Sequence, residues 1–176
     1  IWPQENQKIH KKTKICSYIV SNKNYTKDQK MRINLLQYYQ KNPHDNIKLF
    51  GRGHNPLPEN HEAGEYDGKI FALKDYAFSL VIENHIQNNY FSEKLLDCLL
   101  TGTIPIYHGC RKISEYFNMN GFILFSSEDQ VKNIIENLRL EEYNKKIDVV
   151  KENYNKAKKY RDSVQFSFNK LNFKNK

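Results

Sequence analysis

Cysteine is scarce in this sequence, and its spacing excludes the common zinc and dithiol motifs. Cys16, Cys98 and Cys110 are an odd number, and no two of them form a C-x-x-C pair. Cys16 and Cys98 lie inside apolar segments, where a reduced thiol packs like a small hydrophobic side chain. We therefore expect these two to be reduced core residues, which favours a reducing compartment such as the cytoplasm.

Long apolar runs are absent as well. No stretch approaches 18 apolar residues, and the sequence contains no secretory signal pattern. The chain begins with Ile1 rather than a methionine. We therefore expect a fragment of a longer protein, from which an anchoring segment could have been removed.

Motifs for metal or nucleic-acid binding are also missing. No H-E-x-x-H is present, and His54 and His61 are too loosely placed for a metal site. The net charge of +8 and the pI of about 9.2 suit an anionic ligand, an acidic membrane or a nucleic acid. The lysines are nevertheless spread along the whole chain, without a basic block or the fingerprint of a nucleic-acid module. We therefore expect no metal site and no nucleic-acid partner.

What the sequence does contain is a strand–loop–helix–strand unit over residues 76–109. Its first strand, Phe78–Ile82, is an apolar run of strand length. Ser92 occupies the N-cap position of a helix predicted over residues 92–101, and a second buried strand is predicted over Thr103–Tyr107. The loop of this unit lies where open α/β sheets bind ligands.

The charges at the start of this helix favour an anionic ligand. We expect its first turn to offer unpaired N–H groups at the positive end of the helix dipole. Lys94 adds a full positive charge, so the place suits a phosphate. Glu93 would repel a phosphate at close range, and its functional role would be to accept a hydrogen bond from a sugar hydroxyl. The alternative is that both residues are ordinary first-turn charges.

Three segments carry a resemblance to a known family. They are Glu83-Asn84, Tyr90-Phe91-Ser92-Glu93-Lys94 and Gly102-Thr103-Ile104-Pro105-Ile106-Tyr107-His108-Gly109. In order and spacing they resemble the donor-binding signature of the α-1,3-fucosyltransferases, glycosyltransferase family 10. The sequence departs from that signature at Ile82, His85 and His108, which puts the sugar and acceptor preferences in question.

The resemblance implies a fold and a domain division. It implies an α/β fold with a Rossmann-like open parallel sheet flanked by helices, forming the C-terminal, donor-binding half of a GT-B glycosyltransferase. Residues 1–12 would be a linker or arm, 13–138 the nucleotide-sugar-binding domain, and 139–176 a C-terminal helix and tail. The N-terminal acceptor domain of the family has no room in this chain and would be a missing partner.

Further elements that complete such a sheet are predicted along the chain. They are strands over Lys14–Val20, Asn46–Phe50 and Gly121–Phe125, and helices over 27–40, 70–76, Arg111–Phe117 and 127–138. Apolar residues from Leu140 to Ala157 recur at three- to four-residue spacing, which predicts an amphipathic helix. Residues 163–176, where apolar and polar residues alternate, could form an edge strand or a tail.

The resemblance also implies a chemistry, namely inverting transfer from a nucleotide sugar to a hydroxyl of a glycan or another acceptor. The donor in the family is GDP-fucose. The Asp-x-Asp motif with which many glycosyltransferases hold a metal is absent, so no cofactor is expected. Arg32 and Lys94 would neutralise the diphosphate instead, since a guanidinium is a planar fork of donors. Without the resemblance, Arg32 would be one of several solvated basic residues.

Four further residues complete the expected substrate-binding set. Glu93 would bind the ribose, and Asn84 and Tyr90 the region of the donor. Glu83 would hold the loop or touch the donor sugar. Each has a structural alternative: Asn84 could cap the loop backbone, and Tyr90 could pack on the sheet.

The catalytic base is not assigned to this chain, because in the family a carboxylate of the N-terminal domain accepts the acceptor proton. His85 and His108 flank the predicted cleft and are the remaining candidates, with a neutral core or rim histidine as the alternative. Two other functions stay open: a nucleotide-sugar-binding module without turnover, and a transferase that uses a different sugar nucleotide.

Overall fold

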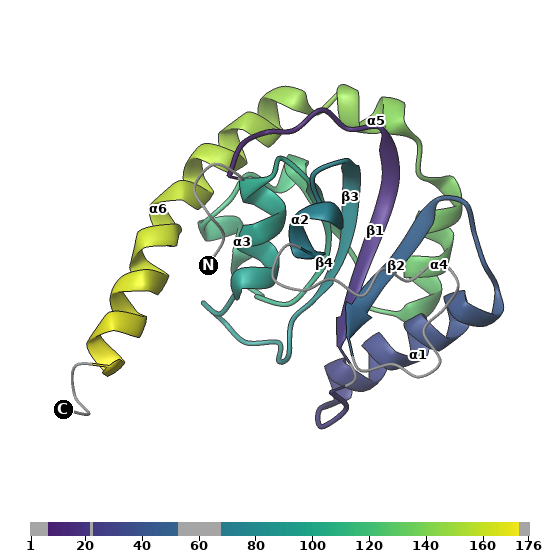
Figure 1. The fold of residues 1–176 in the computed structure, drawn as a ribbon, viewed down its shortest axis with the longest axis horizontal. Coiled ribbons are helices and arrows are strands. Elements are labelled where there is room, and N and C mark those ends of the chain that lie inside the picture. The colour runs from purple at the N-terminus through teal and green to yellow at the C-terminus, as the bar shows by residue number, and fades with distance from the viewer. Residues whose placement is uncertain (1–6, 22, 53–67, 173–176) are drawn as a thin grey trace.

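A five-stranded parallel sheet forms the centre of the molecule in this computed structural model, which describes residues 7–21, 23–52 and 68–172 (Figure 1). The strand order is β2-β1-β3-β4-β5. The strands are Lys14–Ser21 (β1), Ile47–Arg52 (β2), Tyr76–Ile82 (β3), Ile104–His108 (β4) and Ile123–Leu124 (β5). All neighbouring pairs are parallel, so the carboxyl ends of the strands meet at one edge. The predicted α/β fold with an open parallel sheet is confirmed.

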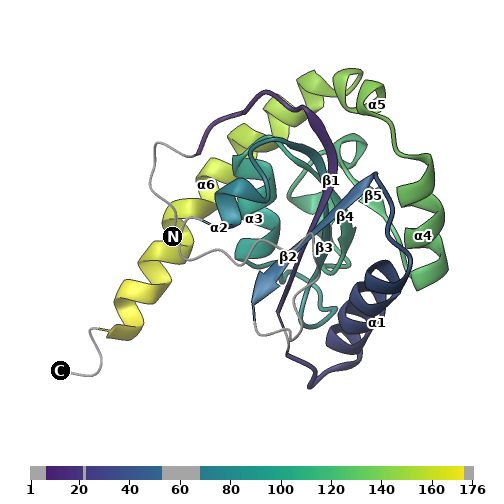
Figure 2. The ribbon, with the colours of Figure 1, turned by 45° about the vertical axis from the view of Figure 1, so that its right-hand side comes forward.

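Helices cover both faces of the sheet, as Figures 1 and 2 show. They are Lys27–Lys41 (α1), Gly68–Phe71 (α2), Glu93–Leu100 (α3), Glu128–Asn137 (α4), Leu140–Asn144 (α5) and Ile147–Asn172 (α6). Every residue of β3 and β4 is buried, which explains why these two strands read as continuous apolar runs. Since side chains alternate along a strand, Phe78, Leu80 and Ile82 pack in a core shared with α1 and α4, while Val81 packs with α3.

The predicted N-caps form as the sequence indicates. The side chain of Ser92 accepts a hydrogen bond from the amide of Lys94 at the start of α3, and Ser127 caps α4 in the same way. Helix α1 begins with a capping box, in which Thr26 and Gln29 satisfy one another's backbone amides. These caps fix where α1 and α3 begin, at the carboxyl edge of the sheet.

The C-terminal part differs from the prediction. The expected continuous helix from Leu140 is divided into α5 and α6 by a turn after Asn144. Next to this turn, the hydroxyl of Tyr143 donates to the Gly102 carbonyl at 2.8 Å. The predicted helix Arg111–Phe117 is a single 3-10 turn over Ile113–Glu115. Residues 163–172 belong to α6 and not to an edge strand. Apolar and polar residues alternate here over too few positions to distinguish the two-residue period of a strand from the 3.6-residue period of a helix.

The described part of the predicted arm, residues 7–12, is anchored and is not a free linker. Lys12 is 8% exposed, and its Nζ donates to the carbonyls of Leu73, Lys74 and Thr101 and to Thr103 Oγ1 at 2.8–3.2 Å. These acceptors lie at the amino ends of β3 and β4, opposite the edge where ligands are expected. In the described ranges, no helix is both long and apolar enough to cross a membrane.

Candidate functional site

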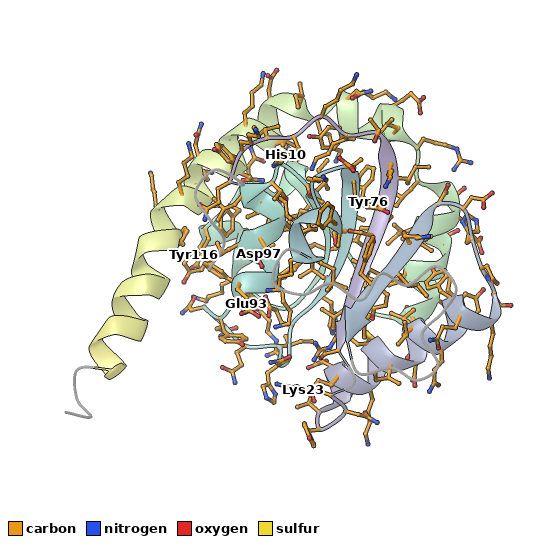
Figure 3. All side chains as sticks on the ribbon, viewed as in Figure 1. His10, Lys23, Tyr76, Glu93, Asp97 and Tyr116 are labelled. Carbon is orange, nitrogen blue, oxygen red and sulfur yellow. The ribbon has the colours of Figure 1, made fainter. Side chains whose placement is uncertain are left out.

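A cavity of about 320 Å³ lies between β1, β3, α2 and α3 and opens at the carboxyl edge of the sheet. Four of the six expected substrate-binding residues line it: Arg32, Asn84, Glu93 and Lys94. Glu83 and Tyr90 are not among its described wall residues. In Figure 3, Glu93 and Lys23 lie toward the carboxyl edge, where β1 ends and α3 begins. The structure therefore brings most of the predicted set to one opening, and their binding roles stay predictions.

Arg32 is the most unusual of these residues. It projects from α1, is only 4% exposed, and its Nη2 donates to Asn84 Oδ1 at 2.7 Å. Its Nε is buried without a hydrogen-bond partner among the described residues. Burial lowers the pKa of Arg32, and the nearby Tyr18, Glu83, Asp28 and Glu93 oppose that effect. A buried guanidinium with one side-chain acceptor is under-satisfied, and an anion in the cavity would accept from the N–H groups that reach it.

Asn84 acts here as a bridge between β3 and α1. Its side-chain oxygen accepts the bond from Arg32, and its carbonyl accepts from Thr26 Oγ1 at 2.9 Å. Thr26 is also the N-cap of α1. Asn84 thus orients Arg32 relative to the end of β3, a role that differs from both expectations, and its contact with the nucleotide sugar stays a prediction.

The start of α3 presents cationic and anionic side chains, and two of its amides are already hydrogen-bonded within the protein. Lys94 Nζ lies 3.2 Å from Glu93 Oε1 and 3.4 Å from Ser92 Oγ. The amide of Lys94 is bound by Ser92 Oγ at 3.3 Å, and the amide of Ser92 by Glu83 Oε1 at 2.9 Å. For these two amides the expectation of unpaired N–H groups was wrong, because the capping serine and Glu83 already use them. Positive charge at this place therefore comes from the lysine and the helix dipole.

Glu93 is an ionised carboxylate beside that lysine. Burial alone would raise the pKa of Glu93, but the Lys94 ammonium and the hydrogen bonds to the carboxylate bring it below its usual value. The side chain of Glu93 remains 56% exposed. It is an available acceptor at the cavity mouth, as a ribose contact requires.

Glu83 is part of the framework and not of the cavity wall. It is 0% exposed, and its carboxylate accepts from the amide and hydroxyl of Ser92, at 2.9 and 2.6 Å. Burial raises the pKa of Glu83, and these two hydrogen bonds oppose the shift only in part. A Cβ on Gly109 would lie 2.6 Å from Glu83 Cγ, so only glycine fits beside it. Of the two roles expected for Glu83, the geometry favours holding the loop.

The remaining candidates are not among the described wall residues of the cavity. Tyr90 is half-buried, and burial raises its pKa, as do the negative charges of Glu83 and Glu93. His108 is 9% exposed, stacks on Phe125 and directs its Nδ1 to the Phe125 carbonyl at 3.1 Å. Its Nε2 lies 3.4 Å from Asp28 Oδ1, so both ring nitrogens have neighbours. His85 is exposed.

Two cavity residues were missed by the sequence analysis. Lys69 on α2 and Asp97 on α3 form an ion pair of 3.0 Å within the cavity wall. Asp97 could have been found, because it follows Glu93 by four residues and therefore shares its helix face. Lys69 gave no signal, since its place depends on a helix of four residues far from α3 in the sequence. Across the described ranges, no three His, Cys, Asp or Glu side chains gather as a metal site would require.

Comparisons with known proteins agree on one family. Residues 9–175 match the model for "Glycosyltransferase family 10 (fucosyltransferase) C-term". A Bos taurus 3-galactosyl-N-acetylglucosaminide 4-alpha-L-fucosyltransferase is 30% identical over 119 residues, which is 64% of this chain and 29% of that protein. The chain therefore spans less than a third of this relative.

Solved structures show the same fold. A crystal structure of an α1,3-fucosyltransferase aligns with a TM-score of 0.54 and 25% identity, covering 84% of this chain and 38% of that one. A structure of an α1,3-fucosyltransferase with GDP-fucose aligns with a TM-score of 0.55 and 23% identity, covering 84% and 40%.

Proposed function

The chain belongs to glycosyltransferase family 10, the fucosyltransferases, and on that premise we propose that it binds a nucleotide-sugar donor, GDP-fucose, for metal-independent inverting transfer to a hydroxyl acceptor. The acceptor is a glycan or another hydroxyl compound. The choice of donor is supported by the α1,3-fucosyltransferase of the same fold that was solved with GDP-fucose.

The observation that carries the proposal is the incomplete bonding of Arg32. Arg32 lines the cavity, and its guanidinium has one side-chain acceptor, Asn84, and a buried Nε without a partner among the described residues. Burying a charged group without full hydrogen bonding costs free energy, and a diphosphate oxygen at this place would offset that cost. Lys94 adds a second cation to the wall of the same cavity.

These two cations suit the departure of a nucleoside diphosphate. In inverting transfer, the acceptor oxygen attacks the anomeric carbon while the bond to the diphosphate breaks, and negative charge grows on the diphosphate. Fixed cations beside that charge stabilise the transition state more than the ground state. Glu93 would accept a hydrogen bond from a ribose hydroxyl, and Tyr90 would cover the nucleotide sugar from beside the cavity. Glu83 and Asn84 would hold the loop and Arg32 in place.

The proton of the acceptor hydroxyl requires a base, and His108 is poorly suited because its ring nitrogens face Phe125 and Asp28. We assign the base to the part of the protein that this chain does not span. The chain would then supply the donor side of the reaction and depend on an N-terminal acceptor domain for turnover.

Titration calorimetry with GDP and GDP-fucose tests the donor assignment. We expect Arg32→Ala and Lys94→Ala each to weaken binding about tenfold or more, because each removes a charge-assisted hydrogen bond to phosphate. Lys30→Ala is the matched control, since Lys30 is exposed on the same helix as Arg32 and should leave affinity unchanged. Unchanged nucleotide affinity in both cavity variants would contradict the proposal.

A further inference from the structure

The ion pair of Lys69 and Asp97 has no role in the proposed binding of phosphate and ribose. Lys69 Nζ lies 3.0 Å from Asp97 Oδ2, and both residues line the cavity. Their side chains are 42% and 16% exposed. An isolated surface pair stabilises a fold very little, and burying its carboxylate is unfavourable. Stability therefore does not explain why this carboxylate lines a cavity.

Asp97 presents an unused acceptor to that cavity. Oδ2 accepts from Lys69, whereas Oδ1 has no hydrogen-bond partner among the described residues. An ionised carboxylate is acceptor-only and has room for about four hydrogen bonds. Burial raises the pKa of Asp97, and the neighbouring Lys69 ammonium opposes that shift only in part. The pair therefore offers a fixed carboxylate edge to two adjacent N–H donors.

The position of Asp97 matches the nucleoside end of a donor. Figure 3 shows Asp97 on the same helix as Glu93 but farther from the carboxyl edge. Four residues of an α-helix rise about 6 Å, so Asp97 lies one turn deeper than the expected ribose contact. The sugar to be transferred must face the acceptor outside the cavity. The base, at the opposite end of the donor, must then point inward.

The inner wall also suits a flat aromatic ring. Ile19, Leu73 and Val81 line the cavity together with Asp97, so apolar side chains lie on the same wall as this carboxylate. This arrangement of apolar walls with few polar groups is typical of small-molecule sites.

We propose, resting on the proposed function, that Asp97 selects guanine by accepting hydrogen bonds from its N1–H and its 2-amino group, with Lys69 as the positioning residue. Guanine is the common base with two adjacent donors on this edge. Adenine presents its N1 lone pair to a carboxylate, and uracil presents one N–H between two carbonyls. Adenine or uracil would therefore leave an oxygen of the Asp97 carboxylate unpaired or facing another acceptor. The loss of hydrogen bonding at a buried polar group lowers the affinity for such a base strongly.

Binding constants for three nucleoside diphosphates test this assignment in the 176-residue chain. IDP lacks the 2-amino group, and XDP carries a carbonyl there. We expect the unmodified chain to bind IDP about 10-fold more weakly than GDP, and XDP more weakly still. This comparison requires no variant and so does not depend on whether a substitution folds.

Asp97→Asn provides the second readout, because the amide keeps the shape of the side chain but replaces one acceptor with a donor. The new donor matches the 2-carbonyl of xanthine. We expect GDP affinity to fall about 10- to 100-fold and XDP affinity to rise. A purely structural role for Asp97 would weaken all three nucleotides by the same factor.

Asp129→Asn is the control, since it makes the same chemical change on a side chain that is 91% exposed at the start of α4. It should leave all three affinities unchanged. Equal affinity of the unmodified chain for GDP and IDP, or a uniform loss in Asp97→Asn, would overturn the base assignment while leaving nucleotide binding intact. Failure of the unmodified chain to bind GDP at all would instead overturn the proposed function as well.

Discussion

Arg32 is the residue that distinguishes this cavity most clearly from an ordinary polar surface. Arg32 is 4% exposed, has one side-chain acceptor in Asn84 and keeps a buried Nε without a partner among the described residues. Sequence reasoning reached Arg32 only through the family resemblance, because nothing in its neighbours distinguishes it from a solvated cation. Its burial follows from α1 packing on β1 and β3, a contact between distant segments that local patterns do not encode.

Replacing Arg32 with lysine should not preserve binding. Lysine keeps the charge but lacks Nε and the planar fork, so it cannot bond Asn84 and a phosphate in the same geometry. We expect Arg32→Lys to weaken GDP binding about tenfold, measured by calorimetry. Affinity equal to that of the unmodified chain would show that charge alone is sufficient.

Glu83 should make stability depend on pH. Burial raises its pKa in the folded chain, so between the unfolded value of about 4.3 and that raised value the folded chain binds more protons. Stability should therefore fall as pH rises through this window. Glu83→Gln keeps the shape of the side chain, still accepts from the Ser92 amide through its one oxygen, and does not titrate.

Urea unfolding of both proteins at several pH values from 4 to 8 measures this effect. We expect the free energy of unfolding of the unmodified chain to decrease relative to Glu83→Gln as pH increases. A difference that stays constant, or that increases with pH, would contradict the assignment of a raised pKa.

At the scale of elements, the junction of β3 and α3 connects the sheet to the site. Glu83 at the end of β3 binds both the amide and the hydroxyl of Ser92, and Ser92 caps α3. This junction sets the direction in which α3 presents Glu93 and Lys94. The N-cap at Ser92 thus positions Glu93 and Lys94 as well as stabilising α3.

A pair of cap variants separates these two effects. Ser92→Ala and Ser127→Ala each remove an N-cap, and each should lower the free energy of unfolding by about 1 kcal/mol. Only Ser92→Ala should also weaken GDP binding, because it releases Glu83 and Lys94. Equal GDP affinity in the two variants would show that the junction does not position the site.

Much of this element pattern could be predicted from sequence. Buried apolar runs identified β3 and β4, and capping residues placed α3 and α4 within one residue. The break between α5 and α6 could not be predicted, because the apolar spacing from Leu140 to Ala157 does not reveal contacts between distant segments, such as the bond of Tyr143 to Gly102 beside the break. The ion pair of Lys69 and Asp97 was missed for the same reason, since its two members meet only in the tertiary structure.

In the molecule as a whole, the carboxyl edge and the amino edge of the sheet have different roles. The carboxyl edge carries the cavity, and the amino edge is closed by residues 7–12. Tyr154 of α6 donates to the Gln7 carbonyl at 2.8 Å, and α6 packs along α3. The segment before β1 and the last helix therefore support α3 from the side away from the cavity mouth.

Lys12 should be essential to that closure. Burial lowers the pKa of Lys12 to about 7, so at pH 6 it is an ammonium bound to four oxygen acceptors. Lys12→Met removes those donors and should lower the free energy of unfolding by about 2 to 3 kcal/mol at pH 6. Lys11→Met, one residue away and exposed, should change it by less than about 0.5 kcal/mol. Equal effects of the two substitutions in urea unfolding would show that the hydrogen bonds of Lys12 do not stabilise the fold.

The most direct test of the account compares GDP with guanosine, which differ only by the diphosphate. If Arg32 and Lys94 bind that group, calorimetry should show GDP binding about 100-fold tighter than guanosine in the unmodified chain. In the double variant Arg32→Ala, Lys94→Ala, this ratio should fall below about tenfold while guanosine affinity stays the same. An undiminished ratio in the double variant would contradict the central claim that these two cations hold the diphosphate.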